Sequence, residues 1–153
     1  MIDTVENRIS QTLEEKFPEF DVLPFPVNFE EFHNTSPTGC FLTRFENMVF
    51  QVQNTLTAVN CNTDYNFTVF FSARYLQNHR EAYEFLKKLV KTLNGLDILN
   101  KRLMLKKLVF EDEINGDLWY SLSVCVNLPV VDENKNLSIS EDDLDVLFPR
   151  KAV

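Results

Sequence analysis

The strict alternation of residues between Leu118 and Leu128 constrains the fold of this chain more than any other sequence feature. One set of positions holds Leu118, Tyr120, Leu122, Val124, Val126 and Leu128, and the intervening set holds Trp119, Ser121, Ser123, Cys125 and Asn127. A period of two predicts a β-strand with one buried face. The Asn115-Gly116 pair just before it predicts a tight hairpin, because this dipeptide suits a two-residue turn.

Other segments also have the patterns of strands. Residues 65–75 alternate cleanly, and residues 39–50 begin as a strand. Residues 51–64 are rich in Asn and Thr and lack a clear period, so a long loop and a loose hairpin are both open interpretations. An extended segment around Pro24 and Pro26 is expected at a sheet edge, because proline cannot donate a ladder hydrogen bond.

Two segments, 3–17 and 78–95, have the spacing of amphipathic helices. A capping box is predicted to begin the first at Asp3 and the second at Asn78. Gly95 is expected to end the second helix. A single helical turn, capped by its first residue, is predicted over 28–32.

The order of these elements predicts one α+β domain over residues 1–131. We expect a two-layer domain with a mainly antiparallel or mixed sheet and two main helices packed on one face. The hydrophobic fraction of 44% and the fourteen Phe residues are sufficient for a core. Residues 132–153 are interpreted as an acidic C-terminal extension.

Charge and cysteine usage exclude several classes of function. The formal net charge of −8 argues against sequence-specific binding of nucleic acid, which requires a clustered basic face. Cys40, Cys61 and Cys125 are widely spaced, which indicates reduced thiols and neither a disulfide framework nor a zinc site. The sequence contains neither a signal peptide pattern nor an apolar run long enough to span a membrane.

The sequence contains no recognisable catalytic motif. Its two histidines, His33 and His79, are interpreted as surface or capping residues. Residues 132–143 partly match a calcium-binding loop, but Leu137 replaces the required glycine and Asp143 the long bidentate glutamate. We therefore expect no enzymatic activity, no cofactor and no metal site.

The pattern of the chain resembles the small tail-protein family of Mu-like bacteriophages and prophages, which we associate with tail termination or completion. The resemblance covers about residues 1–130. It is carried by MIDTVENRISQTLEEKFP, VLPFP, NFEEF, GCFLTRFEN, DLWYSLSVCVNLP and, most tellingly, FFSARYLQNHREAYEFL leading to the Asn-Gly helix stop.

This resemblance implies a structural virion protein of the head-proximal tail end, made in the cytoplasm of the host bacterium. Such a protein forms a hexameric ring that caps the tail tube of a contractile tail. Its implied partners are further copies of itself, the tail tube, possibly the sheath protein, and a neck or head-completion protein, with no membrane involved. The alternative is an adaptor of a contractile injection system or prophage-derived complex that does not form a ring.

Residues left over after assigning the core are candidates for oligomer and tube contacts. The segment 46–63 carries more apolar residues than an idle loop should expose, although a further hairpin of the same sheet would also explain them. Lys87 and Lys88 belong to a basic run, with Glu84 placed to pair with Lys88, and this run is a candidate intersubunit partner for the acidic tail. The candidate contact residues are Met48, Val49, Phe50, Val52, Leu56, Lys87, Lys88, Leu144, Leu147 and Phe148.

Overall fold

A computed structural model describes residues 1–33, 35–54 and 59–130 of the chain. The predicted order of the main elements is confirmed. In chain order they are α1 (Ile2–Lys16), β1 (Asp21–Pro24), the 3₁₀ helix η1 (Phe29–Glu31), β2 (Gly39–Asn54), β3 (Val59–Ala73), α2 (His79–Leu93), β4 (Asp97–Ile98), β5 (Lys101–Arg102), β6 (Met104–Ile114) and β7 (Asp117–Val130). The short β4–β5 pair was not predicted.

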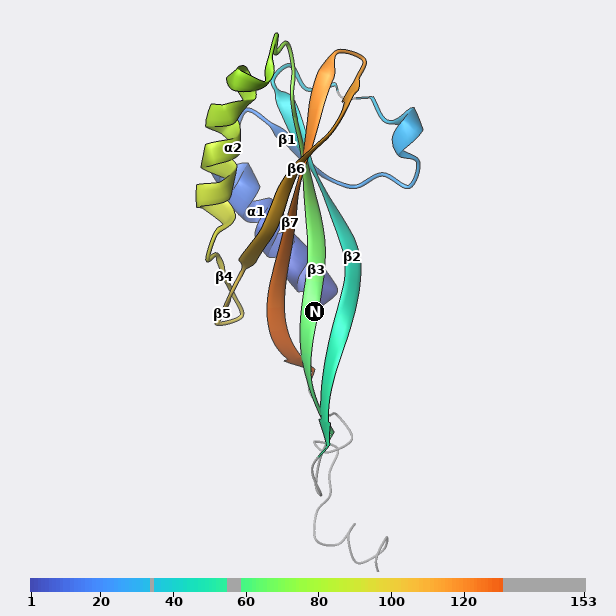
Figure 1. The fold of residues 1–153 in the computed structure, drawn as a ribbon, viewed down its shortest axis with the longest axis vertical. Helices are drawn as coiled ribbons and strands as arrows, with labels where there is room; N and C mark the ends of the chain where they lie inside the picture. Colours follow the sequence, from blue (N-terminus) through green and yellow to red (C-terminus); the bar gives the residue numbers. More distant parts are fainter. Residues whose placement is uncertain (34, 55–58, 131–153) are drawn as a thin grey trace, which may run out of the picture.

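The main sheet has five strands in the order β1-β2-β3-β7-β6 (Figure 1). The β1 strand runs parallel to β2, and the remaining pairs are antiparallel. The predicted turn between β6 and β7 is confirmed, since Asn115 and Gly116 have φ angles of 53° and 85°. The fold is therefore α+β with a mixed sheet, as predicted.

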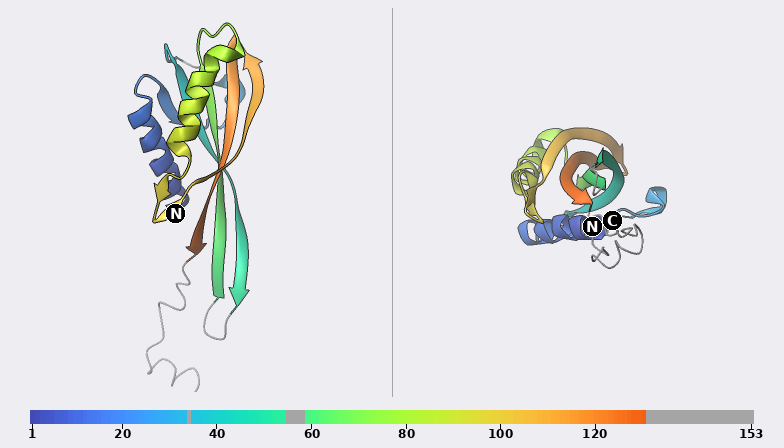
Figure 2. Two further views of the ribbon diagram at one scale, coloured as in Figure 1. Left: turned by 60° about the vertical axis from the view of Figure 1, so that its left-hand side comes forward. Right: turned by 90° about the horizontal axis from the view of Figure 1, so that it is seen from below.

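Both helices pack against one face of the sheet, and Figure 2 shows them on the same side. The residues that face them include every second residue of β3 and β7. The shared core contains Val5, Ile9, Leu13, Phe41, Phe67, Val69, Phe71, Ala82, Leu86, Leu89, Leu93, Tyr120, Leu122 and Val124. Burial of these apolar side chains holds the two layers together.

The opposite face of the sheet is also covered at one end. Cys40, Leu42 and Trp119 form a second buried cluster there, and the aromatic rings of Phe29 and Phe32 pack on Trp119. The segment that contains η1 therefore acts as a small lid on the face away from the helices (Figure 1). This is why Trp119, on the face of β7 that a half-buried strand would leave in solvent, is buried.

The interpretation of residues 51–64 as a loop is wrong, whereas the hairpin alternative is confirmed. Strand pairing runs without a long break from Gly39 opposite Ala73 to Asn54 opposite Val59, with one irregularity between Phe45 and Asn47. The segment is polar because much of the distal hairpin lies outside the helical layer.

Two predicted caps are also wrong. Asp3 lies within the first turn of α1 and Met1 holds the N-cap position, while the Asn28 side chain makes no capping hydrogen bond. The N-cap predicted for α2 is confirmed, because Asn78 Oδ1 accepts a hydrogen bond from the Glu81 amide. The second half of the predicted capping box differs, since the Glu81 carboxylate accepts from the Gln77 amide and not from that of Asn78. The alternation predicted to Tyr75 ends at Ala73, and Tyr75 is exposed with a φ of 62°.

Candidate functional site

The distal part of the β2–β3 hairpin extends beyond both helices (Figure 1). Val49 and Phe50 are exposed there to 48% and 55%. Their partners, Asp64 and Thr63, are adjacent residues of β3, so Val49 and Phe50 point to opposite faces of the sheet. The hairpin therefore exposes apolar surface on both of its faces.

The remaining hairpin candidates differ in position. Val52 lies in β2 opposite Cys61, and Leu56 lies outside the described residues. Met48 is half-buried and contacts the main core, so it is less available to a partner than Val49 or Phe50.

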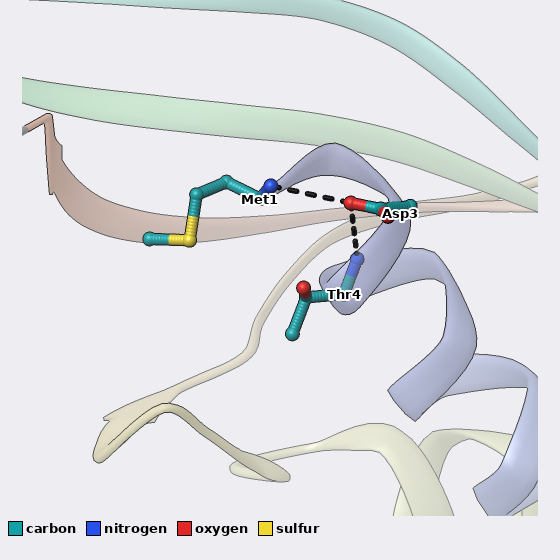
Figure 3. Close-up of polar contacts among 3 residues, drawn as sticks. All are labelled: Met1, Asp3 and Thr4. Carbon is teal, nitrogen blue, oxygen red and sulfur yellow. Dashed lines mark hydrogen bonds and ion pairs between the residues drawn. The ribbon is translucent and has the colours of Figure 1, made fainter.

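An open pocket of about 470 Å³ lies between the start of α1 and the hairpin, where Met48 and Tyr65 line it together with Met1. The Met1 amino group lies 3.2 Å from Asp3 Oδ1, which also accepts a hydrogen bond from the Thr4 amide (Figure 3). The bond from the terminal ammonium lowers the pKa of Asp3.

The two candidate lysines of α2 face different neighbours. Lys87 Nζ lies 3.2 Å from Glu84 Oε1, so Glu84 pairs with Lys87 and not with Lys88 as predicted. The Lys88 ammonium lies 4.7 Å from the centroid of the Phe17 ring, which places it against α1. The structure therefore separates these residues into different surfaces.

Lys87 lines an apolar groove between α2 and β6 that sequence reasoning missed. The groove has a volume of about 410 Å³ and is lined by Tyr83, Leu86, Lys87, Val90, Lys91 and Leu108. Its walls come from elements that are not adjacent in the chain. The one sequence signal was the run Leu108-Val109-Phe110, which is more apolar than the two-period pattern of a half-solvated strand requires.

The two edges of the sheet differ. The β1 edge is four residues long and ends at Pro24, which has no amide hydrogen. The β6 edge is eleven residues long and exposes Met104, Leu108, Val109 and Phe110. Short, proline-containing edges resist pairing with another strand, whereas long apolar edges invite it.

The face of the sheet away from the helices is polar over its middle. Asn66 donates a side-chain hydrogen bond to Asn47 at 2.8 Å, and Asn127 donates one to Asp64 at 2.8 Å. Lys106 and Lys107 lie along the same face, and therefore outside the α2–β6 groove. Lys106 and Lys107 thus lie on a different surface from Lys87 and Lys88 of α2.

The buried thiols of Cys40 and Cys125 are held in their neutral forms. Burial, together with smaller contributions from the carboxylates of Asp21 and Asp117, raises the pKa of Cys40 to about 12. Burial also raises the pKa of Cys125. His79 Nδ1 lies 2.6 Å from the Tyr120 hydroxyl. A thiol with so high a pKa is a poor nucleophile, because the thiolate is the reactive form.

Within the described ranges, no three His, Cys, Asp or Glu residues are close enough to hold a metal ion. The calcium-loop pattern at 132–143 lies outside those ranges. Among the described helices, none is long and apolar enough to cross a membrane.

Comparison with known families provides the classification. The model of the Gp37 protein family matches residues 9–141, which is most of the chain. The chain belongs to the Gp37 family. Gp37 is a phage-type family, so the chain is a phage structural protein and a virion component in the general sense predicted from its sequence. A search of curated proteins gives no match.

The Gp37 match divides the candidate residues. It includes the β2–β3 hairpin, α2 and β6, so the exposed hairpin and the groove both belong to the part of the chain that the family shares. Leu144, Leu147 and Phe148 follow the end of the Gp37 match and lie outside the described residues. Their contacts stay a prediction.

Proposed function

We propose that this Gp37-family chain is a tail terminator or completion protein. In this role it forms a ring, expected to be hexameric, that caps the tail tube and joins it to the neck of a contractile phage or prophage-derived tail. Its partners are neighbouring copies, the tube, possibly the sheath, and the neck protein. The role is structural and not enzymatic.

The distal β2–β3 hairpin is the observation that carries this proposal. It extends beyond the helical layer and exposes Val49 and Phe50 on opposite faces, with Val130 of β7 also exposed beside it. A long hairpin with apolar side chains on both faces can contact two partners at once. This geometry suits a subunit that must contact both a neighbouring copy and the tube.

The unlike sides of the subunit also support a ring. A closed ring is built from heterologous contacts, in which one side of a subunit binds a different side of the next. The proline-containing β1 edge and the apolar β6 edge provide two such sides.

The mass of the protein, free and on assembled tails, tests the proposal. We expect a ring of one defined stoichiometry at the head-proximal end of the tail, and a tail of uncontrolled length when the protein is absent. A single copy per tail, or tails of normal length without it, would instead favour the adaptor alternative.

A double substitution tests the hairpin itself. Val49→Ser with Phe50→Ser should abolish incorporation into tails while the melting temperature changes little, because both side chains are already exposed. Val27→Ser with Leu99→Ser is the matched control, since these side chains are also exposed but lie outside the hairpin. Equal incorporation of both variants would remove the hairpin from the interface.

A further inference from the structure

The apolar groove between α2 and β6 is lined by residues of both elements and has exposed side chains at its rim. Tyr83 and Leu108, on its two walls, are exposed to 48% and 40%. Leu86 and Val90 form its floor with the carbon stems of two lysines. Apolar surface gathered in a groove in this way is typical of a binding site and not of an idle surface.

The backbone of β6 adds a second requirement for the occupant. Among the described strands β6 pairs only with β7, so the hydrogen-bonding groups on its outer side are free to bind an added strand. Addition of an extended segment to such an edge is a common mode of peptide recognition. The occupant should therefore be an extended segment.

The charges along the groove define the chemistry of that segment. Lys87 and Lys91 both line the groove. Lys87 already contacts Glu84, whereas Lys91 makes no ion pair with any described residue. An occupant with apolar side chains on one side and carboxylates on the other would satisfy both surfaces.

We propose that residues 141–148 of the same chain, with the sequence EDDLDVLF, occupy this groove in the free subunit. In an extended conformation Leu144, Val146 and Phe148 share one side, and Asp143 and Asp145 lie on the other. The apolar side enters the groove between Tyr83 and Leu108. The acidic side lies beside Lys87 and Lys91.

The length of the chain permits this docking. Leu108 is opposite Leu122, and β7 continues from there to Val130, which is about 27 Å farther along the strand. With a sideways step of about 10 Å across two strand spacings, the distance from Val130 to the groove is about 30 Å. Residues 131–140 can extend to about 35 Å, so they can connect the two.

A tether of this length favours docking within one chain. Two segments joined through a few residues of one chain meet at a millimolar effective concentration, which exceeds that of other copies in dilute solution. The docked segment covers the β6 edge and so prevents free subunits from pairing edge to edge. This differs from the intersubunit pairing predicted from sequence. The docking concerns the free subunit, and the segment must leave the β6 edge wherever that edge contacts the next copy in the proposed ring.

Cysteine crosslinking in the full-length chain tests the proposal. In a Cys61→Ser background, Tyr83→Cys is combined with Leu144→Cys, and the control combines Ser123→Cys on the opposite face of the sheet with Leu144→Cys. We expect the first pair to form an intramolecular disulfide at least about tenfold faster than the control. The mass of the product should be that of a monomer.

Charge reversal completes the test. Lys87→Glu with Lys91→Glu should slow crosslinking of the first pair severalfold. Lys16→Glu with Lys101→Glu, an equal change of charge outside the groove lining, should not. Equal rates for the two cysteine pairs, a product with the mass of a dimer, or insensitivity to charge reversal in the groove would overturn the proposal. None of these results would bear on ring formation at the tail.

Discussion

Two asparagines at helix N-cap positions differ in whether the side chain makes a capping hydrogen bond. Asn28 and Asn78 both hold N-cap positions and both were predicted to cap, but only Asn78 makes the side-chain hydrogen bond. Asn78 precedes a fifteen-residue helix, whereas Asn28 precedes a three-residue 3₁₀ turn. The residue type is the same, so sequence alone cannot separate the two cases.

This difference predicts unequal effects of the same substitution. Asn78→Ala should lower the free energy of unfolding by about 1 kcal/mol, because it removes the acceptor for the Glu81 amide. Asn28→Ala should change it by only a few tenths of a kcal/mol. Urea denaturation measures both, and equal losses would contradict the assigned caps.

The raised pKa of Cys40 predicts a loss of stability at alkaline pH. The thiol titrates at about 12 in the folded chain, above its ordinary value of 9.0. From about pH 9 upward the unfolded chain releases this proton while the folded chain retains it, so the free energy of unfolding falls as pH rises toward 12. Below about pH 8 this group contributes no pH dependence.

Substitution isolates this contribution from other groups that titrate in the same range. Cys40→Ala should unfold with a shallower decline of stability between pH 9 and 11 than the parent chain, measured by thermal denaturation. Cys61→Ala is the control, because Cys61 is only partly buried. A parallel decline in all three proteins would show that Cys40 does not carry the effect.

The elements were predicted best where one of their faces is buried. The alternation of β7 and the proximal part of β3 was evident, because the helices cover one side of them. The distal hairpin was ambiguous, since a strand beyond the helical layer has no buried face to impose alternation. The β4–β5 pair was missed because each strand has two residues and the turn uses Leu99, with a φ of 50°, where glycine or asparagine is expected.

Two glycines at the strand ends are predicted to differ in their tolerance of alanine. A Cβ at Gly39 would lie 2.1 Å from the backbone oxygen of Ser72, whereas one at Gly116 would meet nothing within 4 Å. Both residues have positive φ angles, of 151° and 85°. Gly116→Ala should therefore cost about 1 kcal/mol of unfolding free energy from backbone strain alone.

Gly39→Ala should cost about 3 kcal/mol or more, because the start of β2 must also move away from β3. Chemical denaturation of both variants gives the comparison. A smaller loss for Gly39→Ala than for Gly116→Ala would contradict the close approach of the two strands.

At the scale of the whole molecule, the fold class could be predicted but the interaction surfaces could not. One layer of helices on one face of a sheet follows from the helical spacing of apolar residues in two segments and from their two-residue alternation in the strands. The groove brings together α2 and β6, and its existence depends on strand order, which sequence patterns do not determine. For the same reason Lys87 and Lys88, neighbours in the chain, were grouped, although Lys87 lines the groove beside β6 and Lys88 lies over the ring of Phe17 at the end of α1.

Amide hydrogen exchange should differ between the part of the sheet that lies under the helices and the distal β2–β3 hairpin. Amides of Val69 and Leu122, in central strands under both helices, should exchange only through global unfolding. Amides near Val49 and Phe50 should exchange faster, because the distal hairpin lies beyond the helical layer. Uniform protection along β2 and β3 would show that the hairpin is part of the same cooperative unit.

The contrast between the two sheet edges has a consequence for polymerisation. A molecule with two receptive edges can grow into an endless ribbon, with each copy extending the sheet of the last. Here β1 is only four residues long and Pro24 has no amide hydrogen, so strand addition is disfavoured on the β1 side and favoured on the β6 side. Growth by this route stops after one step, which protects a concentrated pool of subunits from forming fibres.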